Sequence, residues 1–197
     1  MDLDDNHFHL NYGWAALIYG SMFSGKTEKL VTTLRRVDKY SGLKVQVFKP
    51  VIDNRYGENI VSTHDGISIP AIQVQSVAEM RSLLRKDTQV VGVSETQFLD
   101  DGIIEFCSEQ KMLGRKIVLE GLVLDYRKEP FRFANGFTRT MLDLLAHSYP
   151  IPMTAMCYEC GKPAFYTMRK TSSKELVLIG DKSTYCAACW DHHKIPE

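Results

Sequence analysis

The sequence predicts an α/β protein in which helices flank a mainly parallel sheet, followed by a small cysteine-rich domain. Short apolar runs alternate with segments of helical periodicity from Trp14 onwards, a pattern typical of a parallel sheet covered by helices. A glycine-rich loop joins the first apolar run to the first helical segment. Four of the five cysteines lie beyond residue 151, which sets the end of the chain apart.

The elements follow from the hydrophobic pattern. Residues 14–19 predict a buried strand, and residues 26–40 predict a helix whose apolar side chains share one face. Further strands are predicted at 45–48, 69–74, 89–93 and 116–119, and further helices at 77–86, 103–113 and 137–148. Pro70 favours a sheet edge for the strand at 69–74, and the polar stretch 53–68 predicts a long loop or hairpin.

This pattern divides the chain into three parts: a loose polar arm (1–12), a nucleotide-binding domain (13–150) and a metal-binding domain (151–197). The 24 basic and 24 acidic residues balance, which disfavours a nucleic-acid binder. The acidic start lacks the pattern of a secretory signal, and no apolar run is long enough to span a bilayer. A soluble, cytoplasmic protein without a membrane partner is therefore expected.

The glycine-rich loop fits the P-loop pattern G-x-x-x-x-G-K-[ST] at every fixed position, and it lies between a predicted strand and a predicted helix. Backbone N–H groups of such a loop, together with the helix N-terminus, bind phosphate oxygens. Lys26 would reach the β- and γ-phosphates of ATP, and the Thr27 hydroxyl would bind Mg²⁺. The loop consists of Gly20, Ser21, Met22, Phe23, Ser24, Gly25, Lys26 and Thr27.

Glu95 follows the predicted strand at 89–93. Carboxyl ends of parallel strands carry the ligand-binding residues of such sheets, and an alcohol that attacks phosphorus must lose its proton to a nearby base. Glu95 is therefore the candidate general base. A solvated loop residue is the alternative reading.

Taken in order, the motifs resemble those of the type II, cytosolic-type thymidine kinases from about residue 13 to residue 189. Besides the P-loop, the matching segments are Phe48-Lys-Pro50, Asp53-Asn-Arg55-Tyr56, Thr63-His-Asp-Gly66, Glu95-Thr-Gln-Phe98, Gly121-Leu-Val-Leu-Asp-Tyr126, Glu129-Pro-Phe131, Cys157-Tyr-Glu-Cys160, Thr167-Met-Arg169, Ile179-Gly180, Tyr185 and Cys186-Ala-Ala-Cys189.

The resemblance implies ATP-dependent phosphorylation of the 5′-hydroxyl of thymidine or deoxyuridine, with Mg²⁺ and a structural zinc ion, in a homotetramer inhibited by thymidine triphosphate. It implies catalysis by Glu95 and nucleotide contacts from Asp53, Arg55, Ser94 and Gln97. A "lasso" loop would close over the base. The substrate residues that it implies are Met22, Phe98, Leu122, Tyr126, Phe131, Leu176, Val177, Leu178, Ile179, Gly180 and Tyr185.

Three positions depart from the family pattern. Ser94 stands where the family usually has an aspartate that helps to hold Mg²⁺ through water, and Val123 replaces a second acid. Tyr185 directly precedes Cys186, so the lasso would close differently or Tyr185 would be drawn toward the zinc. A nucleotide-binding paralogue with little turnover is therefore an alternative to a full kinase.

The paired cysteines predict a closed, structural zinc site. Cys157 and Cys160 form one C-x-x-C pair, and Cys186 and Cys189 form the other; four thiolates suit tetrahedral zinc. A disulfide or redox pair is the alternative. His192 and His193 are substitute ligands in principle, but we expect them in an exposed tail. A zinc-ribbon module that binds nucleic acid is the remaining alternative function, and Cys107 is expected to be a buried thiol.

Overall fold

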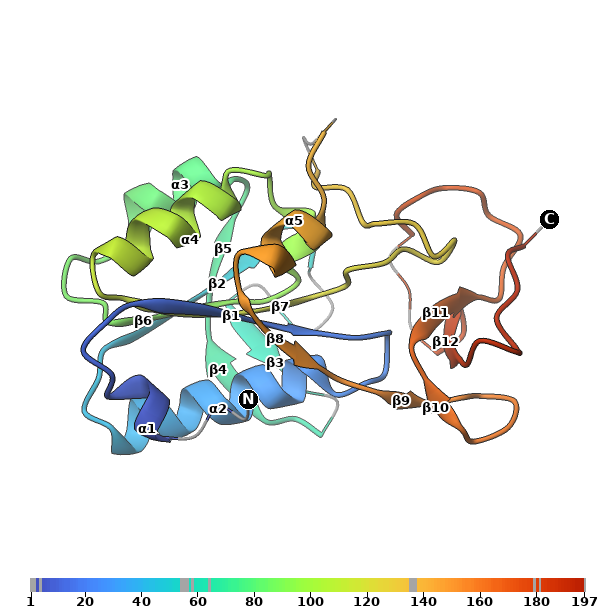
Figure 1. Ribbon diagram of the computed structural model, residues 1–197, viewed down its shortest axis with the longest axis horizontal. Helices are drawn as coiled ribbons and strands as arrows, with labels where there is room; N and C mark the ends of the chain where they lie inside the picture. The colour runs from blue at the N-terminus through green and yellow to red at the C-terminus, as the bar shows by residue number, and fades with distance from the viewer. Residues whose placement is uncertain are drawn as a thin grey trace.

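The computed structural model describes residues 3, 5–53, 57, 59–63, 65–134, 138–178, 180 and 182–196. Its centre is a six-stranded, all-parallel sheet in the order β5-β2-β6-β7-β1-β8 (Figure 1). The predicted parallel sheet is thus confirmed. Its strands are β1 (Trp14–Tyr19), β2 (Val45–Pro50), β5 (Ile72–Val74), β6 (Val90–Val93), β7 (Lys116–Gly121) and β8 (Tyr149–Pro152).

Helices cover both faces of this sheet (Figure 1). Short α1 (Asp5–Phe8) and long α2 (Lys26–Tyr40) lie on one face, and α3 (Val77–Leu83), α4 (Ile103–Met112) and α5 (Met141–Ala146) lie on the other. Side chains of a strand alternate between faces. Ala16 and Ile18 of β1 accordingly pack with the α2 side, whereas Ala15 and Leu17 pack with the α4 side.

The N-terminal segment differs from the loose polar arm that we expected. Leu3 and Phe8 are buried in the core beneath α2. The Trp14 indole donates a hydrogen bond to the backbone carbonyl of His7, and its ring meets Phe8 edge to face at 5.1 Å. Two apolar residues in a polar segment are enough to anchor it, because burying one large apolar side chain contributes about 1.5–3 kcal/mol.

Three element predictions also need correction. The single strand predicted at 69–74 is two strands, because β4 (Ser68–Pro70) pairs with β3 (Ile60–Ser62) in a hairpin while β5 joins the main sheet as its edge. The last helix begins only at Met141, since Thr140 forms a capping box with Asp143. Strand β8 was missed because two of its four residues are prolines, which a sheet tolerates mainly in an edge strand, and β8 is such an edge.

The C-terminal part consists of two small antiparallel pairs. β9 (Ala155–Met156) pairs with β10 (Pro163–Ala164), and β11 (Tyr166–Arg169) pairs with β12 (Tyr185–Ala188). They lie beside the carboxyl end of the main sheet (Figure 1). The predicted buried thiol is confirmed, since Cys107 of α4 is fully buried. Within the described residues, no helix combines the length and apolar character needed to cross a bilayer.

Candidate active site

One cavity of about 330 Å³ lies between the carboxyl ends of the central strands and the C-terminal part. It brings together Glu95 and the predicted nucleotide and substrate residues that the structure describes, except Gly20, Ser21, Ser24 and Gln97, which do not line it. Arg55 and Ile179 fall outside the described residues. Further wall residues, to which the sequence analysis assigned no role, are Glu28, Ile52, Val61, Ser62, Thr63, Asp65, Asp125 and Lys182.

The P-loop turns sharply between β1 and α2. Gly25 has φ +81°, a left-handed conformation that glycine adopts at little cost. The Lys26 ammonium and the Ser24 hydroxyl both donate to the carbonyl of Ser21 at 2.8 Å. These bonds hold the lysine over the loop, at the N-terminus of a 15-residue helix, where an anion is favoured.

Glu95 sits on a left-handed backbone with φ 47° and ψ 46°. A non-glycine residue pays for that conformation, and such residues concentrate at functional sites. The turn directs the chain from β6 into a short 3₁₀ helix, η1 (Thr96–Phe98). The Gln97 amide donates to the Glu95 carboxylate at 2.6 Å and accepts from the backbone N–H of Leu122. Gln97, which is buried, therefore orients the candidate base instead of lining the cavity.

Glu120, near the end of β7, was not predicted as a site residue. It is fully buried, and its Oε1 accepts hydrogen bonds from the Ser94 hydroxyl (2.7 Å), the Glu95 N–H (3.1 Å) and the Thr27 hydroxyl (3.3 Å). Among the described residues, its Oε2 has no hydrogen-bond partner. An acidic residue directly after the apolar run Ile-Val-Leu of this strand was the sequence signal for it.

Burial raises the pKa of the Glu120 carboxyl to about 7, and the nearby charge of Glu95 adds to this effect while Lys26 opposes it. The oxygens of Thr27, Ser94 and Glu120 converge behind the P-loop. Hydroxyl and carboxylate oxygens are the ligands that a hard divalent cation takes, either directly or through its waters. The residues present therefore fit Mg²⁺.

Four aromatic side chains line the cavity, and we call the space beside them the aromatic pocket: Phe98, Tyr126, Phe131 and Tyr185. Phe98 and Phe131 meet edge to face, with ring centroids 5.9 Å apart. Tyr185 is held at the cavity and not drawn toward the cysteine cluster, since its hydroxyl accepts a hydrogen bond from the Arg169 guanidinium at 2.7 Å. Its hydroxyl donates to the carbonyl of Leu178 at 2.8 Å.

Arg169 organises the segment that covers this pocket. It is almost fully buried, and its guanidinium donates to the carbonyls of Ser173, Glu175 and Leu176 and to the Tyr185 hydroxyl. It also lies 3.8 Å from the centroid of the Tyr126 ring. One planar cation thus connects the segment 173–178 to two aromatic residues of the cavity.

Two buried aspartates support the loops around the cavity. Asp53 forms an ion pair with Lys49 at 3.5 Å, and Lys49 also donates to the carbonyls of Gly57 and Ile60. Asp125, which the sequence analysis did not single out, accepts from the backbone N–H groups of Arg127 and Glu129. Both aspartates line the cavity.

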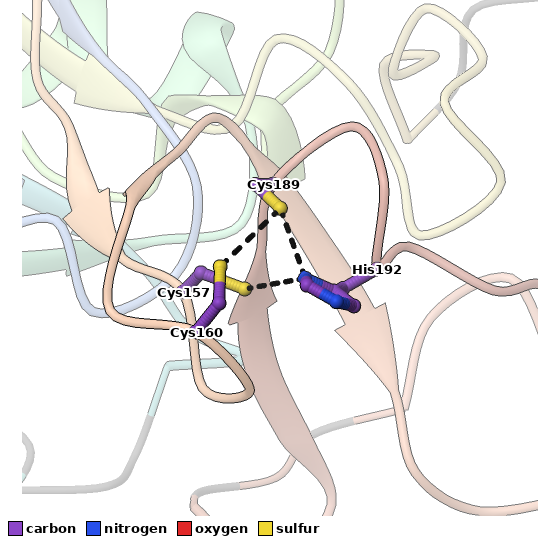
Figure 2. Close-up of side chains that lie close together, drawn as sticks. All are labelled: Cys157, Cys160, Cys189 and His192. Atoms are coloured by element: carbon purple, nitrogen blue, oxygen red, sulfur yellow. Dashed lines mark hydrogen bonds between the residues drawn. The ribbon is translucent and has the colours of Figure 1, made fainter.

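The metal cluster differs from the predicted cysteine quartet. The ligand atoms of Cys157, Cys160, Cys189 and His192 all lie within 4.8 Å of one another, and Figure 2 shows these four side chains converging. Cys186 does not belong to this group, so its prediction as a ligand is wrong, as is the prediction of an exposed tail for His192. Cys186 lies within β12, where residues three apart face opposite sides. The turn after Cys189 brings His192 back instead.

The distances suit zinc. A tetrahedral site with Zn–S bonds of about 2.3 Å has ligand–ligand edges of about 3.8 Å. The Sγ atoms of Cys160 and Cys189 are 3.8 Å apart, and His192 Nδ1 lies 3.8 Å from Cys157 Sγ and 3.3 Å from Cys189 Sγ. A backbone hydrogen bond from Cys189 lowers the pKa of the Cys157 thiol to about 6, which favours the thiolate that binds metal. The cluster is consistent with a structural, four-ligand zinc site.

Comparisons with known proteins agree with this geometry. The family model for thymidine kinase matches residues 13–193. A thymidine kinase of Bdellovibrio bacteriovorus is 36% identical over 183 residues, which cover 92% of this chain and 86% of that protein. Two solved structures share weaker likeness. Domain III of the Thermotoga maritima replication initiation protein DnaA has a TM-score of 0.43 and 15% identity, covering 71% of this chain and 54% of that one. The Legionella pneumophila ATPase DotB has a TM-score of 0.41 and 22% identity, and the match covers 75% of this chain and 38% of the DotB chain.

Both TM-scores are too low to support a statement about function. The family model and the curated relative each span nearly the whole chain. On these two matches, the chain belongs to the thymidine kinase family.

Proposed function

We propose that this protein transfers the γ-phosphoryl group of ATP to the 5′-hydroxyl of thymidine or deoxyuridine. One observation carries the proposal: Lys26, Thr27, Glu95 and the aromatic pocket share a single cavity. A nucleoside base seated against Phe98, Tyr126 and Phe131 would present its sugar toward Glu95, with the phosphates of ATP beyond it. Family membership supports the choice of nucleoside.

The chain's own groups can account for the chemistry. The Glu95 carboxylate takes the proton of the 5′-hydroxyl while that oxygen bonds to the γ-phosphorus and the bond to the β,γ-bridging oxygen breaks. Lys26 and the loop N–H groups balance the charge on the phosphate oxygens. Thr27 and Asp53 would hold the Mg²⁺ that accompanies ATP, and this ion further neutralises the phosphate oxygens.

Replacing Glu95 tests the proposal. We expect Glu95→Gln to lower kcat by about 10²–10⁴-fold with little change in ATP affinity, because the amide keeps the shape of the side chain but accepts no proton. The measurement is phosphorylation of labelled thymidine and deoxyuridine, with the product identified, alongside nucleotide binding. Glu109→Gln, an exposed change on α4, is the matched control. Unchanged turnover in Glu95→Gln would contradict the role of Glu95 as the general base.

The loss of the acids at positions 94 and 123 favours a second candidate, a nucleotide-binding protein with little turnover. Val123 packs in the apolar core and Ser94 carries no charge. Assays over a wide Mg²⁺ range separate the two candidates. Nucleotide binding without product at every Mg²⁺ concentration would establish the second.

We also propose a homotetramer that thymidine triphosphate inhibits, on family resemblance. Light scattering tests the assembly. Inhibition by thymidine triphosphate that added thymidine relieves tests the feedback.

A further inference from the structure

We propose that Glu120 supplies the carboxylate for the nucleotide's Mg²⁺ that the family usually places at position 94. The carboxylate that helps to hold Mg²⁺ would then come from strand β7, and not from the residue that follows strand β6. This inference shares one assumption with the proposed function, namely that the P-loop binds ATP together with Mg²⁺.

The sheet register makes such a change of strand possible. β6 and β7 are adjacent and parallel, with Val93 opposite Leu119, so Ser94 and Glu120 occupy the next matched level. Matched neighbours in a parallel sheet point to the same face, and neighbouring strands lie about 4.8 Å apart. Both residues belong to the α2 face, because Val118, two residues before Glu120, packs in the core cluster beneath α2.

The contacts of Glu120 place its carboxylate beside Thr27, the residue expected to bind the nucleotide's Mg²⁺. Its Oε1 accepts from the hydroxyls of Thr27 and Ser94. The hydroxyl of Ser94, the residue at the acid's usual position, thus lies in direct contact with the Glu120 carboxylate, 2.7 Å from Oε1.

The second carboxylate oxygen of Glu120, Oε2, indicates a bound cation. A buried carboxylate oxygen is costly without a partner, since burying even a neutral polar group unpaired costs about 1–3 kcal/mol in proteins. Glu120 is fully buried, yet Oε2 has no hydrogen-bond partner among the residues that the structure describes. A hydrated cation beside Thr27 would provide one, because Mg²⁺ keeps several of its waters in protein sites.

A purely structural reading of Glu120 predicts something different. If Glu120 served only to hold the Glu95 N–H, its loss would reduce stability and displace the base without changing the affinity for metal. The two readings therefore differ in a metal-binding measurement that needs no turnover.

The test titrates Mn²⁺ into the full-length protein saturated with a non-hydrolysable ATP analogue, and follows free Mn²⁺ by electron paramagnetic resonance. We expect Glu120→Gln to weaken Mn²⁺ binding by about 10–100-fold, with no loss of thermal stability because the uncharged amide is easier to bury. The matched control Glu109→Gln should leave Mn²⁺ affinity unchanged. Unchanged affinity in Glu120→Gln, or lower stability at equal affinity, would overturn the proposal.

A rescue variant completes the test. Adding Ser94→Asp to Glu120→Ala returns a carboxylate to the family's position, and we expect this double variant to recover most of the Mn²⁺ affinity that Glu120→Ala loses. Failure to recover it in a folded double variant would contradict the proposal. A wild-type protein that binds Mn²⁺ with the analogue but phosphorylates no nucleoside would defeat the proposed function and leave this inference standing.

Discussion

At the scale of single residues, the direction of a side chain decides its role more than its chemical type does. Cys186 and Cys189 form a C-x-x-C pair like Cys157 and Cys160, but Cys186 lies within strand β12 and outside the ligand cluster, whereas Cys189 follows the end of that strand and belongs to the cluster. Cys189 and His192 have the same spacing across a turn. Tyr185 adjoins Cys186, yet it lines the cavity, where its hydroxyl bonds the Arg169 guanidinium and the carbonyl of Leu178.

This geometry predicts the outcome of replacing each metal ligand. We expect His192→Ala to lower bound zinc well below one per chain, because three ligands remain, whereas Cys186→Ser should retain the metal. Zinc content by atomic emission, together with the melting temperature, checks both. Zinc retained by His192→Ala and lost from Cys186→Ser would restore the cysteine quartet.

At the scale of elements, the segment over the aromatic pocket depends on Arg169. Planar guanidinium donors suit several fixed acceptors at once, and a lysine ammonium does not reproduce them. We expect Arg169→Lys to raise the KM for thymidine by about tenfold or more, since hydrogen bonds to a charged group contribute about 1.5–3 kcal/mol each. The ATP KM should change little.

Steady-state kinetics with each substrate, together with proteolysis of the 170–184 segment, measures the effect of Arg169→Lys. The same exchange at Arg35, whose guanidinium bonds the carbonyl of Ser68 at an exposed position, is the control. Equal increases in both KM values would show a general disturbance of the fold instead.

The contact between β6 and α2 is the second element-scale feature. A methyl group on Gly92 would approach Leu34 Cδ1 to 2.3 Å, so the buried Leu34 side chain would have to move. We expect Gly92→Ala to cost about 1–3 kcal/mol of unfolding free energy. Chemical denaturation measures this loss of unfolding free energy. In the Leu34→Ala background, Gly92→Ala should cost less, because the shorter side chain leaves space for the added methyl group. Fully additive losses would contradict this packing argument.

At the scale of the whole molecule, the C-terminal part that carries the metal cluster contacts the P-loop directly. The N–H of Met22 donates to the Thr167 hydroxyl at 2.9 Å, and the Ser21 hydroxyl donates to the carbonyl of Ala164 at 3.4 Å. This C-terminal part therefore both supports the loop and carries the segment over the pocket. Its own apolar cluster consists of small residues, so a metal bound by the four ligands would contribute to its stability.

Removing zinc should therefore affect the two substrates unequally. We expect chelation to weaken thymidine binding by at least about tenfold, while ATP binding to the larger domain falls less. Calorimetric titration of each substrate before and after chelation, with zinc added back, makes the measurement. Equal losses for both substrates would indicate global unfolding.

The sequence by itself determined the parallel sheet, the P-loop and the position of Glu95. Those features depend on local spacing: glycines at fixed offsets, apolar periodicity, and an acid directly after a strand. Most residues of the aromatic pocket were also predicted, through the family resemblance.

The tertiary structure alone decided which side chains meet. Glu120 and Ser94 are 26 residues apart in the chain and 2.7 Å apart in space, because β6 and β7 pair in register. His192 replaced Cys186 because a turn, not the cysteine spacing, brings ligand atoms together. Pairing register and side-chain direction arise from contacts between distant segments, and local sequence patterns carry little information about them.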